Sequence, residues 1–207
     1  MREVVMRDAG LILIAYLLGS IPFGVLVTRA WGSVDLRRVG SGNIGATNVL
    51  RAVGKGPAAL TLLGDIGKGA FAVGLGRWWG VSPTVLAMVA LAAVLGHLLP
   101  VFGGFRGGKG VATTLGVVLA AMPAVGGLLL LLWLAVAGIW RYSSLAALVA
   151  SVALPLLAWW LDGRPAMVVL GITLLLFVSV RHRGNIVRLW QGTEGKIGQK
   201  VVSPPVQ

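Results

Sequence analysis

Long hydrophobic segments alternate with short polar ones along most of the chain. Asp, Glu, Lys and Arg are absent from residues 9–28, 78–105, 110–140, 142–161 and 165–180. A sixth hydrophobic segment, 58–76, is interrupted only by Asp65 and Lys68. A helix needs roughly 20 apolar residues to cross a bilayer. The pattern predicts an all-α, polytopic membrane helical bundle.

Segment 110–140 decides the topology, because its 31 residues are long for one span and short for two. If the segment is one span, eight Lys and Arg lie on the cytosolic side and nine on the outside. If it breaks at Pro123 into a hairpin, thirteen lie on the cytosolic side and four on the outside; Lys68 lies within the membrane. The positive-inside rule favours the break. We therefore predict about seven transmembrane or partly spanning helices, the N-terminus outside and the C-terminus in the cytosol. The first half of this hairpin is too short to cross fully.

The composition excludes most other classes of protein. Of 207 residues, 57% are hydrophobic, only 12% are charged and none is cysteine, whereas soluble domains carry about 25% charged residues. Residues 2–28 resemble a signal peptide but lack a clear cleavage site, so we interpret them as a retained first span. We expect residues 1–207 to form a single integral-membrane domain.

The charge is strongly positive, with 18 Lys and Arg against 6 Asp and Glu. In a membrane protein this bias is explained mainly by cytosolic loops, so we expect no nucleic acid partner. Scarce carboxylates also argue against a magnesium site, and we expect neither metal nor cofactor. The predicted topology places the polar, glycine-rich motifs on the cytosolic side: residues 29–57, 106–110 and the tail from 181. We therefore expect an active site at the cytosolic face.

The first motif, GSGNIGATNVLR at residues 40–51, contains G-x-G-x-x-G, with Asp65 20 residues beyond Gly45. We reject a dinucleotide site because the neighbouring segments are predicted membrane helices and not the strands that this fingerprint requires. A glycine-rich loop can still bind an anion through its backbone N–H groups. The alternative is a flexible connector. The candidate binding side chains are Ser41, Asn43, Thr47, Asn48 and Arg51.

The second motif, GGFRGGKG at residues 103–110, matches the start of a P-loop, but Gly110 stands where the metal-binding Ser or Thr is needed. Nucleotide hydrolysis is therefore not expected. Glycines, a lysine and the N-terminus of the following helix still suit a phosphate. The alternative is a tight basic turn. The candidate residues are Gly107, Gly108, Lys109, Gly110 and, one turn into the helix, Thr113.

Three further features carry ionisable groups. Asp65 and Lys68 are spaced to share a helix face and neutralise each other, and their role is either functional or structural. A lone His97 is more typical of packing than of ligand binding. The third motif, residues 181–194, places His182 and Asn185 three residues apart. Its arginines could serve only as membrane anchors, and we expect its Glu194 to pair with one of them.

Together these motifs resemble the bacterial integral-membrane acyl-phosphate:glycerol-3-phosphate acyltransferases. The first resembles G-S-G-N-x-G-A-T-N-x-x-R, the second H-x-x-P-V-F-x-x-F-x-G-G-K-G from His97, and the third R-H-x-x-N-I-x-R-L-x-x-G-x-E from Arg181. The resemblance also includes G-S-I-P at 19–22 and G-D-x-x-K-G at 64–69. The tract around Ala147 matches less clearly, which leaves Ser143 and Ser144 without an assigned role.

The resemblance implies transfer of a fatty acyl group from acyl phosphate to the 1-hydroxyl of sn-glycerol 3-phosphate. The products are lysophosphatidic acid and phosphate, in the first step of phospholipid synthesis. It implies catalytic roles for Ser41, Arg51, His182 and Asn185, and a glycerol-phosphate site at residues 107–110. It further implies a bacterial inner-membrane location, contact with membrane lipid, and a soluble enzyme that makes acyl phosphate as a partner.

The alternative function is a membrane transporter of a phosphorylated organic anion. Both functions need basic loops on a helical bundle. Transporters usually bind their substrate near the midplane at the interface of two repeats. The sequence contains no evident repeat, and its polar motifs are predicted to lie at one face. The sequence therefore favours the enzyme.

Overall fold

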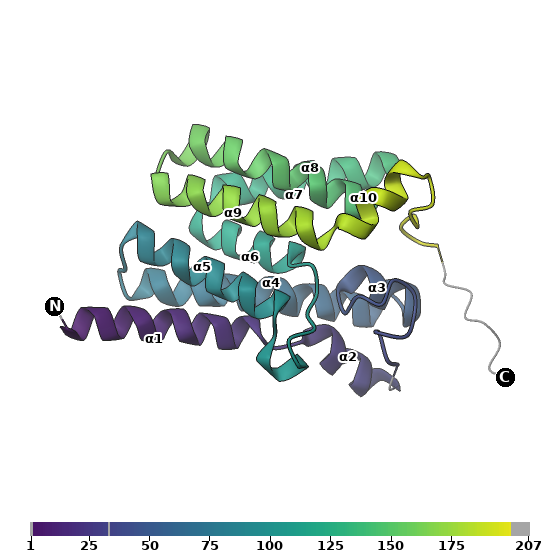
Figure 1. The fold of residues 1–207 in the computed structure, drawn as a ribbon, viewed down its shortest axis with the longest axis horizontal. Coiled ribbons are helices and arrows are strands. Elements are labelled where there is room, and N and C mark those ends of the chain that lie inside the picture. Colours follow the sequence, from purple (N-terminus) through teal and green to yellow (C-terminus); the bar gives the residue numbers. More distant parts are fainter. Residues whose placement is uncertain (1, 33, 200–207) are drawn as a thin grey trace.

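The chain forms a bundle of roughly parallel and antiparallel helices, seen in the computed structural model, which describes residues 2–32 and 34–199 (Figure 1). No strand is present in these two ranges. The α-helices are α1 (Arg2–Gly19), α2 (Phe23–Gly32), α3 (Ala46–Ala52), α4 (Lys55–Trp78), α5 (Pro83–Leu98), α6 (Val111–Ala121), α7 (Pro123–Trp140), α8 (Ser143–Leu157), α9 (Pro165–Arg181) and α10 (Arg183–Trp190). Two short helical turns are η1 (Val101–Gly103) and η2 (Ala158–Asp162).

The prediction of about seven membrane segments is confirmed. Five helical stretches are long and apolar enough to cross a membrane: Arg2–Gly32, Lys55–Trp78, Pro83–Gly103, Pro123–Trp140 and Ser143–Asp162. The pair α9 and α10, bent by 63°, makes a sixth, and α6 is a shorter apolar helix. Helices α6 and α7 are separated at Met122, as the hairpin prediction requires. Pro123 causes this break because proline disfavours helical conformation in the residue before it.

Two boundaries differ from the prediction. The first span begins at Arg2 and is interrupted at residues 20–22 before α2 continues to Gly32. The segment 29–57, predicted as a loop, contains the seven-residue helix α3, and α4 begins within it at Lys55. Helix α3 was missed because seven residues with no long apolar run give no membrane-helix signal. It matters because Arg51 lies on it.

Glycines allow the central helices to approach one another closely. A Cβ atom on Gly96 of α5 would lie 2.2 Å from the carbonyl oxygen of Tyr16 on α1. A Cβ on Gly116 of α6 would lie 2.1 Å from the carbonyl oxygen of Ile66 on α4. Small residues at such crossings are typical of membrane helix pairs, where van der Waals contact supplies much of the association energy. The short helix α6 is thereby held against α4.

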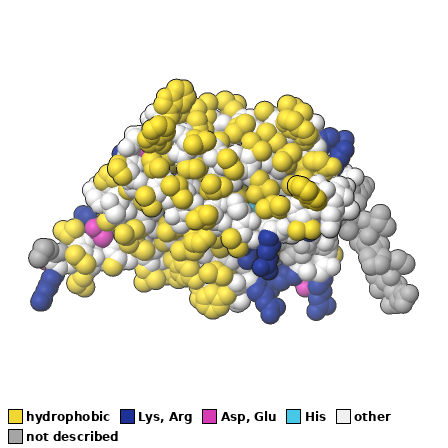
Figure 2. Space-filling model, turned by 45° about the horizontal axis from the view of Figure 1, so that its top comes forward, with side chains coloured by type: hydrophobic (Ala, Val, Ile, Leu, Met, Phe, Trp, Pro, Cys, Tyr) yellow, Lys and Arg dark blue, Asp and Glu magenta, His cyan; other side chains and the backbone are white. Residues whose placement is uncertain are grey.

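The outer surface suits a bilayer. Figure 2 shows one face covered largely by hydrophobic side chains, with Lys and Arg gathered toward its edges. Exposed tryptophans lie near both ends of the bundle, which is typical of membrane interfaces. At one end they are Trp78, Trp159 and Trp160, and at the other Trp31, Trp140 and Trp190. The second end also carries α3, α10 and the segment 99–110, so all three motifs meet there (Figure 1).

Candidate functional site

The first motif forms an ordered loop that is held by Asn48. This side chain is 1% exposed, and its Oδ1 accepts a hydrogen bond of 3.0 Å from the backbone N–H of Ser41. Its Nδ2 donates to the carbonyl oxygens of Leu36 at 3.1 Å and Val39 at 3.0 Å. Both amide protons and the amide oxygen are thus engaged within the loop, so Asn48 holds the loop in shape, and its contact with substrate stays a prediction. Ser41 itself is exposed.

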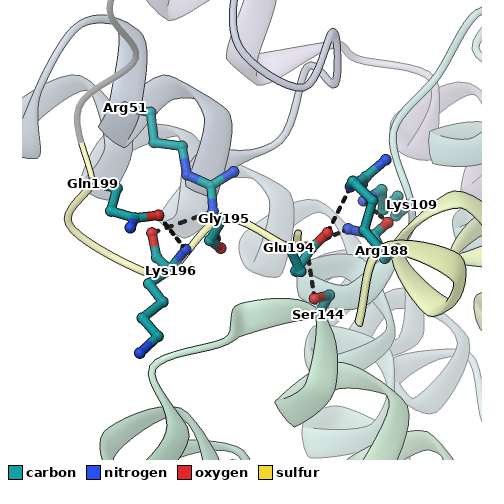
Figure 3. A network of polar contacts seen from close by, with 9 residues as sticks. Arg51, Lys109, Ser144, Arg188, Glu194, Gly195, Lys196 and Gln199 are labelled. Atoms are coloured by element: carbon teal, nitrogen blue, oxygen red, sulfur yellow. Dashed lines mark hydrogen bonds and ion pairs between the residues drawn. The ribbon is translucent and has the colours of Figure 1, made fainter. Parts of the chain in front are cut away.

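Arg51 links this loop to the C-terminal tail. Its Nη2 donates to the carbonyl oxygens of Gly195 at 2.7 Å and Lys196 at 3.4 Å (Figure 3). Its Nε is buried and has no hydrogen-bond partner in the described ranges. An unsatisfied buried donor is costly, which marks Nε as a candidate ligand contact. On the same helix, the hydroxyl oxygen of Thr47 lies 3.1 Å from the hydroxyl oxygen of Ser143 on α8.

The second motif is a backbone turn clamped by Arg181. The Nη2 atom of Arg181 donates at 2.8 Å to the carbonyl oxygens of both Gly107 and Gly108. The turn ends at Gly110, whose φ of +84° favours glycine and which caps the N-terminus of α6. The clamp joins the second motif to the first residue of the third. Sequence reasoning did not assign this role to Arg181.

A chain of polar contacts then connects the turn to the tail (Figure 3). Lys109 Nζ donates to Asn185 Oδ1, and Asn185 Nδ2 donates to Glu194 Oε1 at 2.6 Å. The same carboxylate accepts from Ser144 Oγ at 2.7 Å and from Arg188 Nε at 2.7 Å. The predicted pairing of Glu194 with an arginine is confirmed. Glu194 is the centre of the network, and Ser143 and Ser144, unassigned from sequence, both join the site.

Burial, hydrogen bonds and neighbouring charges shift the pKa values of two groups in this network. Burial lowers the pKa of Lys109 to about 8; the Glu194 carboxylate opposes this shift, and nearby arginines reinforce it. Burial alone would raise the pKa of Glu194, but hydrogen bonds from Ser144, Asn185 and Arg188 outweigh it and leave this pKa below its ordinary value. At neutral pH the site therefore holds a lysine ammonium beside a carboxylate.

The catalytic candidates of the third motif lie at the junction of α9 and α10. His182 is 2% exposed, and its Nδ1 lies 2.8 Å from the carbonyl oxygen of Val178. Since a carbonyl can only accept, Nδ1 carries the proton of a neutral ring and Nε2 is left as the acceptor. Asn185, 5% exposed, orients Lys109 as described above.

Two predicted binding residues lie apart from the contacts described so far. Thr113 is fully buried, and its methyl group faces α4, 3.1 Å from a Cβ built on Gly69. The close crossing of α4 and α6 therefore directs this methyl group into the bundle. Thr113 Oγ1 is buried and has no hydrogen-bond partner among the described residues, and its contact with substrate stays a prediction. Asn43 is half-buried and makes no side-chain hydrogen bond to another described residue.

No three His, Cys, Asp or Glu side chains in residues 2–32 and 34–199 are grouped so that they could hold a metal ion. The cationic groups in the network are Lys109, Arg51 and Arg188. Together with the glycine turn, they suit phosphate groups, which Lys and Arg bind through charge-assisted hydrogen bonds.

Comparison with known proteins agrees with this geometry. The family model described as glycerol-3-phosphate acyltransferase matches residues 9–192. A glycerol-3-phosphate acyltransferase of Bordetella petrii is 52% identical over 93% of this chain and 94% of its own. One from Rubrobacter xylanophilus is 53% identical over 93% and 96%.

The fold is also that of solved relatives. A crystal structure of an integral membrane glycerol 3-phosphate acyltransferase, in its glycerol 3-phosphate form, superposes with a TM-score of 0.88 at 43% identity, covering 93% of this chain and 96% of that one. Its lysophosphatidic acid form gives a TM-score of 0.84 at 42% identity, with the same coverage. The chain therefore belongs to the glycerol-3-phosphate acyltransferase family.

Proposed function

We propose that this protein transfers a fatty acyl group from acyl phosphate to the 1-hydroxyl of glycerol 3-phosphate. The hydroxyl oxygen forms an ester bond with the acyl carbon, and the bond from that carbon to the phosphate oxygen breaks. The products are lysophosphatidic acid and inorganic phosphate. The observation that carries the proposal is the network from Lys109 through Asn185 and Glu194 to the tail, which brings the three motifs to one end of the bundle. The family's acyltransferase name leaves the transporter alternative without support.

The two phosphate-binding elements divide the substrates between them. The turn at Gly107–Gly110 and Lys109 bind the phosphate of glycerol 3-phosphate, which the reaction leaves unchanged. Arg51 and Ser41 act on acyl phosphate, to which Arg51 Nε can donate because it has no hydrogen-bond partner in the described part of the chain. Phosphate is a good leaving group, so positioning and cationic stabilisation supply most of the acceleration.

The hydroxyl proton must leave during the attack. A neutral His182 offers Nε2 as an acceptor because its Nδ1 is engaged with the carbonyl of Val178. A phosphate oxygen of a bound substrate is the second acceptor that the chemistry provides. In both routes His182 and Asn185 are active-site residues, and no metal or cofactor takes part in the reaction.

The function is tested by incubating the purified protein with acyl phosphate and labelled glycerol 3-phosphate, in the presence of excess chelator. We expect labelled lysophosphatidic acid and release of one phosphate per ester formed. Acyl-CoA should not replace acyl phosphate. Absence of product, or product from acyl-CoA alone, would overturn the proposal.

The end of the bundle that carries the site faces the cytosol of a bacterial inner membrane in this proposal, and the N-terminus lies outside. Among the described residues, twelve Lys and Arg lie at the site end and four at the opposite end, and this bias supports the orientation. A soluble enzyme that produces acyl phosphate then supplies the donor from the cytosol.

The chain contains no cysteine, so single cysteines can report the orientation directly. We expect Asp35→Cys and Lys196→Cys, both exposed at the site end, to resist an impermeant thiol reagent in sealed cells. Thr84→Cys, exposed at the start of α5, should react. Permeabilised cells should label all three. Labelling of position 35 or 196 in sealed cells would show the opposite orientation.

A further inference from the structure

Three ionisable side chains lie buried inside the bundle, and the proposed chemistry does not use them. Asp65 and Lys68 on α4 are 3% and 5% exposed, and His97 on α5 is 4% exposed. Ionisable groups inside a membrane are expensive and commonly functional. The predicted pairing of Asp65 with Lys68 is confirmed at 2.8 Å. The addition of His97 was not predicted.

Lys68 is the centre of this group, and its ammonium makes two hydrogen bonds and one ion pair. Nζ lies 2.9 Å from the carbonyl oxygen of Ile21, 2.9 Å from His97 Nδ1 and 2.8 Å from Asp65 Oδ1. It also lies 5.9 Å from the centre of the Phe23 ring. One cation therefore connects the break between α1 and α2 with both α4 and α5.

This contact also fixes the tautomer of His97. A lysine ammonium can only donate, so Nδ1 accepts and the proton of the neutral ring sits on Nε2. That side of the ring lies against the second motif, because a Cβ on Gly108 would be 2.2 Å from Nε2. The ring therefore packs directly beneath the glycine turn.

The backbone of His97 holds the same turn. Its carbonyl oxygen accepts a hydrogen bond of 3.2 Å from the N–H of Gly108, and a Cβ on Gly107 would lie 2.0 Å from that oxygen. The carbonyl groups of the two glycines are held separately by Arg181. The turn is thus fixed between His97 and Arg181, immediately before Lys109.

We propose that Asp65, Lys68 and His97 are positioning residues that fix the turn at Gly107 and Gly108, and so set the affinity for glycerol 3-phosphate. The inference rests on the proposed function of that turn. Asp65 orients the ammonium of Lys68, Lys68 orients the ring of His97, and His97 supports the backbone that receives the phosphate. None of the three touches a substrate. Their loss therefore weakens the binding of glycerol 3-phosphate more than it weakens the binding of the acyl donor.

The test is Lys68→Met, which keeps an unbranched side chain but removes the charge and the three donors. We expect KM for glycerol 3-phosphate to rise at least tenfold, while kcat and KM for acyl phosphate stay within about threefold. Calorimetric titration with glycerol 3-phosphate alone should show the same loss of affinity without turnover. A purely structural role would lower the amount of folded enzyme and leave these constants unchanged, which would overturn the proposal.

Arg164→Met is the matched control. Arg164 pairs with Asp162 at 2.6 Å and donates to the carbonyl of Ala121 at 3.1 Å, at the end of the bundle opposite the site. Its loss should leave KM for glycerol 3-phosphate unchanged, and an equal rise in both variants would overturn the proposal.

If Lys68→Met does not fold, Asp65→Asn/Lys68→Met removes the unpaired buried charge and must show the same selective rise in KM for glycerol 3-phosphate. Wild-type enzyme that makes no lysophosphatidic acid would instead contradict the proposed function.

Discussion

Arg51→Ala is expected to lower kcat by 10²–10³-fold, with a much smaller change in KM for glycerol 3-phosphate. Negative charge grows on the acyl oxygen and on the departing phosphate only as the reaction proceeds. Loss of one donor to such a charge typically costs this much in turnover. The Nε of Arg51, which is buried and has no hydrogen-bond partner in residues 2–32 and 34–199, is the donor that the structure makes available.

Steady-state kinetics with each substrate varied in turn separate the two effects. Arg38→Ala is the matched control, since Arg38 is in the same loop but its side chain is 87% exposed and pairs with Asp35 at 3.3 Å. It should keep wild-type kcat. Arg51→Lys retains the charge and one contact to the tail but not the planar fork, so we expect kcat at least tenfold below wild type. Preserved kcat in Arg51→Ala, with raised KM for glycerol 3-phosphate, would assign the guanidinium to that substrate instead.

The fold could be predicted because a membrane imposes few, strong requirements. Uncharged segments mark the helices. The number of Lys and Arg on each side of the membrane favoured a hairpin at 110–140 over a single span. Pro123 gave the position of the break, which the structure has at Met122. Helix α3 could not be predicted in this way, because its seven residues satisfy their backbone locally and need no apolar length.

The site could be predicted as a set of segments but not as a set of contacts. Asn48 and Thr113 were expected to bind substrate because one lies in a glycine-rich motif and the other one turn after such a motif. The structure turns Asn48 toward its own loop and Thr113 toward α4, because tertiary packing decides the direction of a side chain. Spacing along one helix predicted the pairing of Asp65 with Lys68. It could not predict that His97, on another helix, completes the group.

Lys109→Ala is expected to raise KM for glycerol 3-phosphate by roughly 10–100-fold, with kcat little changed. A charge-assisted hydrogen bond contributes about 1.5–3 kcal/mol, and the phosphate that Lys109 binds keeps its charge throughout the reaction. An interaction of equal strength in the ground and transition states appears in KM. Lys55→Ala, an exposed lysine at the same end, is the control and should keep wild-type KM.

The pH dependence of KM for glycerol 3-phosphate is a second, independent test of the role of Lys109. The pKa of Lys109 is lowered to about 8, so its ammonium predominates at pH 7 and is lost as the pH rises through about 8. KM for glycerol 3-phosphate should therefore rise between pH 7 and pH 9 in the wild type. Lys109→Ala should lack this rise, and Lys109→Arg, which stays charged, should move it to higher pH. A wild-type KM that is constant over this range, or that falls, would exclude the Lys109 ammonium as the phosphate ligand.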